Sequence, residues 1–236
     1  MNILKFAARR WPWLLGALLL VASTSTATTR AATKKKLPSL KRWPDSSAKR
    51  QWVLHLAQVA GPVIAKRGFP LSVAFAQAAG ESGWGTRMPD NPWGLRGIGD
   101  AGSNVITTKE EFDPGKVVTQ TGQKFAKFSS LAAAANGYCD FLSGKSYKAG
   151  WDLRDADDGL WLLWLWGMGY ATASTYPPFI VAVANRVAVE LDNPEYTIAW
   201  DSTKASIAAK LSKVKAGPER RELTKKLLAP YRSHSA

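Results

Sequence analysis

The sequence predicts an α+β fold that is mainly helical and carries one small β-hairpin lobe. Three observations lead to this fold class. Apolar residues recur at helical spacing over several segments. Two runs rich in Thr, Val and Phe are joined by one Asp-Pro-Gly turn. Finally, 46% of the 236 residues are hydrophobic, which is enough to bury a good core. We therefore expect a groove between the hairpin and the helical body.

The first helix is expected to begin after a serine cap at residue 46 or 47 and to run to about Lys66. Gly61-Pro62 divides or kinks it, because proline has no N–H and clashes with the preceding turn. Gly68 then ends it. Core packing explains the apolar stripe of this helix, and we assign it no function.

The second helix carries Glu81, the first candidate for chemistry. Small and apolar residues over 71–79 predict this helix, and glycines at 80, 83 and 85 end it. At helical spacing Glu81 shares a face with Ala74, Gln77 and Ala78, where most side chains are short and neighbouring elements can come close. Desolvation there raises the pKa of a carboxyl, which suits a general acid near neutral pH. The alternative is a solvated glutamate at a helix end.

Aromatic residues and glycines follow Glu81 in the sequence. Trp84 and Trp93 flank this glycine-rich stretch. Glycines beside aromatic residues are typical of a cleft that stacks sugar rings and lets a ligand approach the backbone. Together with Asn91, the two tryptophans are predicted to contact substrate rather than to catalyse a reaction.

The remaining elements follow from turn chemistry and apolar patterning. Asp113-Pro114-Gly115 favours chain reversal, so the flanking runs form a hairpin. A later run of Trp and Leu is apolar on all sides and predicts a buried helix. The strands are expected at 105–112 and 116–128, and the helices at 129–142 (capped by a serine at 129 or 130), 151–168 and 177–191, the last with Pro177 in its first turn.

The N-terminal segment has the layout of a secretory signal peptide. Basic residues precede an apolar run at 11–22, and small residues follow at a cleavage site. This run is shorter than the roughly 20 residues that span a bilayer, so a permanent anchor is the less favoured alternative. We predict a signal peptide at 1–27, an extended basic linker at 28–45, and hence an exported protein.

The net charge of +14 is concentrated at the ends of the chain. Residues 1–50 hold 11 Lys and Arg and 1 acid, residues 51–196 hold 12 and 14, and residues 197–236 hold 9 and 3. Basic ends on an exported protein are expected to bind anionic cell-wall polymer or lipid head groups. The alternative is that these lysines only solvate the ends. The nearly neutral middle argues against nucleic-acid binding.

Cysteine and histidine usage excludes several kinds of site. Cys139 is the only cysteine, so no internal disulfide can form. His55 and His234 are far apart and form no zinc motif, so we expect neither a metal nor a cofactor. The expected catalytic unit spans 46–196, followed at 197–236 by a basic tail that is helical or partly disordered. We expect a monomer.

Residues 76–96 resemble a known family of enzymes. The signature Ala-Gln-Ala-Ala-Leu-Glu-Ser-Gly-Trp-Gly, followed by Asn-Leu-Phe-Gly-Ile-Lys, is that of the peptidoglycan-hydrolysing β-N-acetylglucosaminidases, which include flagellar rod-cap muralytic enzymes and autolysins. Here Gly80 replaces the aliphatic residue, Pro92-Trp93 replaces Leu-Phe, and Arg96 keeps the positive charge. The resemblance covers roughly residues 50–190 and implies a lysozyme-like fold, in which the helical acid faces a β-lobe across the substrate cleft.

A second block of the family lies in the hairpin. The pattern Thr-Thr-x-Glu-Tyr is best matched at residues 107–112, and the resemblance implies that Glu111 is a second catalytic carboxylate. Strand alternation puts Glu110 and Glu111 on opposite faces, so only one of them lines the cleft. The sequence leaves open which one it is.

A third block resembles the family pattern Gly-Tyr-Ala-Thr-Asp-Pro-x-Tyr at residues 169–176, with Ala173 where the aspartate stands. It implies that Tyr170 orients the sugar or the reaction centre through its hydroxyl, with a packed aromatic residue as the alternative. Tyr176 is implied to contact substrate.

The resemblance implies an exported peptidoglycan hydrolase that cleaves β-1,4 glycosidic bonds at N-acetylglucosamine, with Glu81 as general acid. Such cleavage needs an acid for the departing oxygen and normally a second carboxylate for the oxocarbenium-like centre, although substrate-assisted attack by an N-acetyl group is an exception. One alternative is a lytic transglycosylase or muramidase, which also uses a helical Glu-Ser pair. The other is a non-catalytic cell-wall-binding protein, which the departures at Gly80 and Ala173 would permit.

Overall fold

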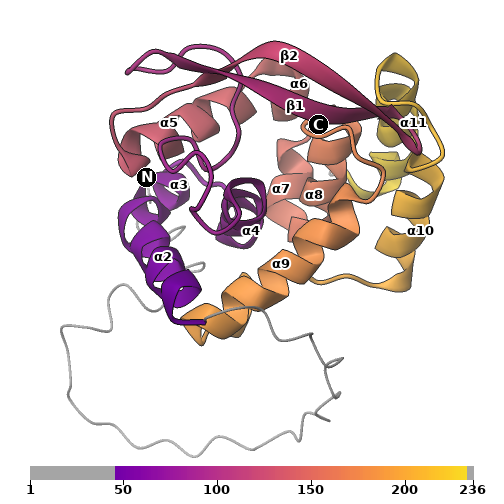
Figure 1. Ribbon diagram of the computed structural model, residues 1–236. Coiled ribbons are helices and arrows are strands. Elements are labelled where there is room, and N and C mark those ends of the chain that lie inside the picture. The colour runs from indigo at the N-terminus through magenta and orange to yellow at the C-terminus, as the bar shows by residue number, and fades with distance from the viewer. Residues whose placement is uncertain (1–45, 233–236) are drawn as a thin grey trace, which may run out of the picture. The chain divides into compact units, whose positions relative to one another are not determined.

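The structure of the protein is a computed structural model that describes residues 46–232 (Figure 1). The predicted signal peptide at 1–27 and the predicted linker at 28–45 lie outside the described residues, as do residues 233–236. Within the described part, every helix is too short or too polar to span a bilayer.

The described residues form helices and one antiparallel hairpin, which confirms the predicted α+β class. Figure 1 shows the hairpin as a long twisted ribbon along one side of the helices. The strands are β1 (Ser103–Asp113) and β2 (Lys116–Ala126). The helices are α2 (Ser46–Val59), α3 (Gly61–Lys66), α4 (Leu71–Ser82), α5 (Leu131–Leu142), α6 (Lys145–Lys148), α7 (Trp151–Ala156), α8 (Asp158–Gly167), α9 (Tyr176–Leu191), η1 (Pro194–Tyr196), α10 (Ser202–Leu211), α11 (Pro218–Leu228) and η2 (Ala229–Tyr231).

Most predicted boundaries hold, and caps explain where they lie. The first predicted helix is divided into α2 and α3, with a proline in the first turn of α3. Ser130 caps α5 by accepting a hydrogen bond from the N–H of Ala133 at 3.1 Å. The predicted helix at 151–168 is wrong as a single element. Asp157 interrupts it, because its carboxylate accepts the N–H of Leu160 at 2.9 Å and starts α8 as a separate helix.

The core is built around α4 and α8. α4 contacts α2, α3, α8 and α9, and Figure 1 shows it in the middle of the helices. Every residue of α8 from Gly159 to Gly167 is buried, as its apolar run predicts. Its Trp164 and Trp166 indoles donate to the carbonyls of Tyr147 and Ala173 at 3.1 and 2.9 Å, so both polar atoms are satisfied inside the core.

Gly80 permits the close approach of α4 and α9. A Cβ atom at this position would lie 2.9 Å from Cε1 of Phe179 and 3.4 Å from Cδ1 of Ile180. The aliphatic residue of the family signature would therefore displace α9 or the Phe179 ring. The glycine at position 80 is thus compatible with close packing between these two helices.

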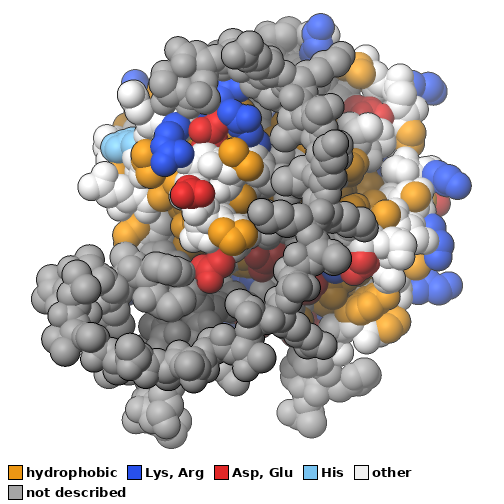
Figure 2. Space-filling view, turned by 90° about the horizontal axis from the view of Figure 1, so that it is seen from below, with side chains coloured by type: hydrophobic (Ala, Val, Ile, Leu, Met, Phe, Trp, Pro, Cys, Tyr) orange, Lys and Arg blue, Asp and Glu red, His pale blue; other side chains and the backbone are white. Residues whose placement is uncertain are grey.

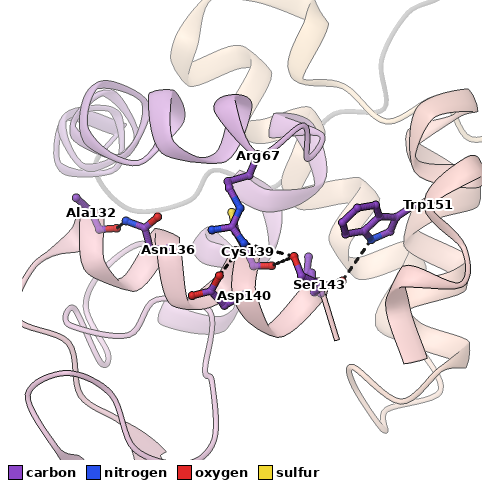
Figure 3. Close-up of polar contacts among 8 residues, drawn as sticks. Arg67, Ala132, Asn136, Cys139, Asp140, Ser143 and Trp151 are labelled. Carbon is purple, nitrogen blue, oxygen red and sulfur yellow. Dashed lines mark hydrogen bonds and ion pairs between the residues drawn. The ribbon is translucent and has the colours of Figure 1, made fainter. Parts of the chain in front are cut away.

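A second junction joins the end of α3 to α5 (Figure 3). Nη2 of Arg67, which follows α3, lies 2.6 Å from Oδ1 of Asp140 on α5. Since both charged groups are exposed, this ion pair contributes little to stability. At the end of α5, the indole of Trp151 on α7 donates to the carbonyl of Leu142 at 3.4 Å. The neighbouring Cys139 is buried, and burial raises the pKa of its thiol to about 12, which makes it a poor nucleophile.

Residues 197–232 form helices that pack against α8. α11 begins at Pro218, directly after Gly217, and both α10 and α11 contact α8. Thr224 on α11 is fully buried. A Cβ atom at Gly167 would lie 2.1 Å from the hydroxyl of Thr224, so the glycine at the end of α8 allows α11 to dock.

Candidate active site

A rigid turn follows Glu81 at the end of α4. Gly83 adopts a left-handed conformation with φ of 58°, which favours glycine and ends the helix. The hydroxyl of Ser82 donates to the carbonyl of Ala78 at 2.6 Å and accepts the N–H of Gly85 at 2.8 Å. The Glu-Ser-Gly-Trp-Gly motif is therefore a helix end that its own serine holds in place. This turn fixes the position of Glu81 at the end of α4.

Glu81 itself is partly buried, neither fully solvated nor sealed from the surface. Burial raises the pKa of its carboxyl, and the charge of Glu110 raises it further, whereas a hydrogen bond from Tyr176 and the charge of Arg87 lower it. A Cβ atom on Gly94 would lie 3.9 Å from Oε2 of Glu81, so the turn that contains Gly94 passes beside the carboxyl group. These are the surroundings that a general acid needs.

A buried chain of hydrogen bonds leads to Glu81 from the core. The hydroxyl of Tyr138 donates to Oε1 of Gln77 at 2.6 Å, and Nε2 of Gln77 donates to the hydroxyl of Tyr176 at 3.2 Å. Because Tyr176 accepts from Gln77, its own O–H is directed to the Glu81 carboxyl. Tyr176, predicted as a substrate contact, is 6% exposed and its hydroxyl faces the acid.

The two hairpin glutamates have different surroundings. Along β1, Ile106, Thr108 and Glu110 are partly buried, whereas the residues between them are exposed, so Glu110 lies on the inner face. Glu111, next to a shift in the strand register, is partly buried as well. The Glu110 carboxylate forms an ion pair with the guanidinium of Arg96 and accepts the hydroxyl of Thr172 at 3.2 Å. It is also the hairpin acid whose charge acts on Glu81.

Glu111 is held at the tip of the hairpin. Its carboxylate accepts the N–H of Gly115 at 2.7 Å and the hydroxyl of Ser174 at 2.9 Å. The Gly115 N–H, with smaller contributions from Ser174, lowers the pKa of the Glu111 carboxyl. These contacts brace the hairpin turn, as Arg96 and Thr172 hold Glu110, so the role of Glu111 as the second carboxylate stays a prediction.

Asn91 and Trp93 belong to the scaffold rather than to a sugar-binding surface. Asn91 is fully buried and bonds three backbone groups, the N–H and carbonyl of Leu95 and the carbonyl of Ala126, at 2.8 to 2.9 Å. Trp93 is 1% exposed, donates to the carbonyl of Ala74 at 2.9 Å, and stacks on Tyr138 with ring centroids 5.0 Å apart. Neither residue has a polar group or ring face left for substrate.

The other two predicted aromatic residues remain at the surface in part. Tyr170 is partly buried, and its hydroxyl donates to the carbonyl of Trp93 at 3.1 Å. Burial raises its pKa well above the ordinary value, so it is a neutral donor and not a base. Trp84 is partly exposed, has a left-handed backbone with φ of 62°, and lies under the ammonium of Lys49 at 5.4 Å.

Several residues of the site were not predicted as such. Gln77 shares the helix face of Glu81 and stands in the signature, and Arg96 keeps its charge, so both had a sequence signal. Thr172 and Ser174 had none, because their roles depend on where a distant hairpin folds. Within residues 46–232, no three His, Cys, Asp or Glu side chains lie close enough to hold a metal ion.

A partly buried acid at the end of a central helix, beside an acidic β-hairpin, is an arrangement that glycoside hydrolases use. The family described as mannosyl-glycoprotein endo-beta-N-acetylglucosaminidase, or glucosaminidase, matches residues 57–189, and the chain belongs to this family. The resemblance noted in the sequence is thereby confirmed.

Solved structures share the fold at low sequence identity. The catalytic domain of the autolysin Auto from Listeria monocytogenes is 22% identical with a TM-score of 0.50, over 65% of this chain and 90% of that one. An N-acetylmuramoyl-L-alanine amidase from Staphylococcus aureus is 20% identical with a TM-score of 0.53, over 67% and 50%. A peptidoglycan hydrolase mutant from Sphingomonas sp. A1 is 21% identical with a TM-score of 0.50, over 61% and 98%. No curated protein sequence matches this chain.

Proposed function

We propose that this protein is an exported peptidoglycan hydrolase that cleaves β-1,4 glycosidic bonds at N-acetylglucosamine, with Glu81 as the general acid. The observation that carries the proposal is the desolvated Glu81 carboxyl, whose pKa is raised by burial and by the facing charge of Glu110. The glucosaminidase family supports the class of bond, and an autolysin and a peptidoglycan hydrolase with the same fold support the substrate. The predicted signal peptide supports export.

In the proposed reaction, Glu81 protonates the departing glycosidic oxygen, which needs a carboxyl group that still holds its proton near neutral pH. Glu110 supplies the second carboxylate, in place of Glu111, because it lies on the inner face of the hairpin and acts on Glu81. Arg96 and Thr172 fix its two oxygens. Glu110 then stabilises the oxocarbenium-like centre or takes a proton from water.

The products of digestion distinguish this function from its alternatives. We expect purified peptidoglycan treated with the protein to yield fragments with reducing N-acetylglucosamine ends, measured by mass spectrometry after borohydride reduction. Anhydro-muramyl ends would instead identify a lytic transglycosylase, and reducing N-acetylmuramic acid ends a muramidase. Binding to peptidoglycan without any soluble fragment would identify a non-catalytic wall-binding protein.

We also propose that the helices α10 and α11 bind anionic cell-wall polymer. Figure 2 shows Lys and Arg side chains along the right-hand edge, on the side where Figure 1 draws α10 and α11. Exposed cations outnumber exposed acids there. The cations are Lys210, Lys213, Lys215, Arg221, Lys225 and Lys226, and the acids are Asp201, Glu219 and Glu222.

Reversing charges on α11 tests this binding. We expect the double variant K225E/K226E to sediment with isolated cell walls about 10-fold more weakly than the parent, because phosphate contacts are lost and each contributes to salt-dependent affinity. A K66E variant, whose lysine is exposed on α3, serves as the matched control. Equal sedimentation of both variants, or unchanged binding after phosphate polymers are stripped from the wall, would contradict the proposal.

A further inference from the structure

Arg220 is a buried cation on α11, outside the residues that the glucosaminidase family matches. Arg220 is 1% exposed, and its guanidinium lies over the Trp166 ring at 4.8 Å from the ring centroid. Two of its nitrogens donate to the carbonyl of Val214 at 2.8 and 3.0 Å, which closes the turn before α11. The third, Nη1, donates to the carbonyl of Thr172 at 3.2 Å, in a different part of the fold.

The segment 172–174 that Arg220 holds is the one that contacts the hairpin carboxylates. The hydroxyl of Thr172 donates to Glu110 at 3.2 Å, and the N–H and hydroxyl of Ser174 donate to Glu111 at 3.2 and 2.9 Å. Its carbonyls point the other way, toward Arg220 and Trp166. The segment thus has one side fixed to the helical body and the other fixed to the hairpin.

The connection between α11 and the hairpin is also electrostatic. The charge of Arg220 acts on Glu111, in the direction that favours the carboxylate, and Glu111 acts on Arg220 in return. Figure 1 shows the free end of the hairpin extending to the side where α11 lies. The Arg220 cation therefore lies on the opposite side of the 172–174 segment from the hairpin, and its charge favours the Glu111 carboxylate.

We propose that Arg220 is a positioning residue for the active site, and that α10 and α11 are part of the catalytic unit rather than an accessory tail. Arg220 fixes the Thr172 carbonyl, and through the Thr172 hydroxyl it fixes the Glu110 carboxylate relative to Glu81. This inference rests on the proposed function for its kinetic consequence. Its structural consequence, order in the 172–174 segment, is independent of that function.

The first test measures that order directly. In a folded Arg220→Met variant we expect the backbone amide of Ser174 and that of Gly115 to exchange hydrogen at least about 10-fold faster than in the parent, while amides in α4 keep their protection. Arg221→Met, an exposed neighbour on the same helix, is the matched control and should leave both amides unchanged. Unchanged exchange at Ser174 in folded Arg220→Met would overturn the proposal.

The second test asks whether Arg220 acts through Thr172. We expect Arg220→Met to lower kcat about 10-fold with KM nearly unchanged, since a mispositioned carboxylate weakens the transition state more than substrate binding. In a Thr172→Val background the same change should have little further effect. Additive effects in this double-mutant cycle would show that Arg220 acts elsewhere and would overturn the proposal.

A conservative variant covers the case in which Arg220→Met does not fold. Arg220→Lys retains the charge but cannot reach Val214 and Thr172 together, so we expect partial effects of the same sign in both measurements. If Arg220→Lys behaves as the parent in exchange and in kcat, the guanidinium geometry has no positioning role. If the parent itself cleaves no peptidoglycan, the proposed function fails, while the exchange experiment still decides the role of Arg220.

Discussion

Replacing Glu81 with glutamine is expected to reduce the rate of glycan cleavage by about 10³-fold, within the range that general acids contribute. The amide keeps the size of the carboxyl and can still accept from Tyr176, but it has no proton that it can transfer to the departing oxygen. The initial rate of fragment release from purified peptidoglycan measures the effect. Glu195→Gln, at an exposed position in η1, is the matched control and should retain the rate of the parent.

The pH dependence of activity in the parent and in Glu81→Gln has a definite sign. Because burial raises the pKa of Glu81, the parent should be active below that pKa and lose activity as the pH rises through it, whereas the residual rate of Glu81→Gln should not show this limb. A carboxyl whose pKa is higher in the folded than in the unfolded state also makes the fold less stable once it ionises.

Thermal unfolding of the Glu81→Gln variant therefore separates chemistry from folding. The stability contributed by protonated Glu81 is complete below the unfolded pKa of about 4.5 and is lost as the pH rises through the higher folded value. We expect the variant to unfold at a higher temperature than the parent at pH 7 and at a similar one at pH 4. A variant that unfolds at a lower temperature at both pH values would attribute lost activity to folding.

Much of the fold could be predicted because residues close in sequence determine where most helices and strands begin and end. Pro62 starts α3, Ser130 caps α5, and the Asp-Pro-Gly turn joins the two strands. The break between α7 and α8 could not be seen in the same way. Asp157 lies directly before an apolar run whose spacing continues the helical pattern. Its carboxylate caps α8 only because the backbone at Asp157 is extended, which the sequence does not reveal.

The candidate site was predicted where the signal is local and missed where it depends on distant partners. Glu81 was identified from its own helix and the glycines that end it. Trp93 and Asn91 lie near it in sequence, yet their polar atoms are taken by Ala74 on α4 and by Ala126 on β2. No local sequence pattern shows that the polar atoms of a side chain will form hydrogen bonds with backbone groups of other elements.

The choice between the hairpin glutamates was undecided for a related reason. Alternation states that Glu110 and Glu111 face opposite ways, but it does not state which face meets the helices. That is decided by the register of β1 with β2, which shifts between Glu111 and Asp113, and by the packing of the 172–174 segment. The resemblance favours Glu111, whereas our proposal of Glu110 rests on its charge, which acts on Glu81.

The second large effect is accordingly expected at Glu110. We expect Glu110→Gln to lower the rate of cleavage by about 10²-fold or more, because loss of the carboxylate removes the charge that faces the developing oxocarbenium-like centre. It also removes the charge that raises the pKa of Glu81, so the pH at which activity falls should move down. Initial rates on peptidoglycan over a range of pH measure both changes.

Glu111→Gln is the matched control, since it makes the same chemical change one residue further along the same strand. Its amide oxygen can still accept from the N–H of Gly115 and the hydroxyl of Ser174, whereas its NH2 group cannot accept the N–H of Ser174. Because one hydrogen bond is lost and two are kept, we expect the rate to fall less than about 5-fold. The opposite order of effects would return the second carboxylate to Glu111. Equal, small effects of both substitutions would favour attack by the N-acetyl group of the substrate itself, because that route needs no second carboxylate on the hairpin.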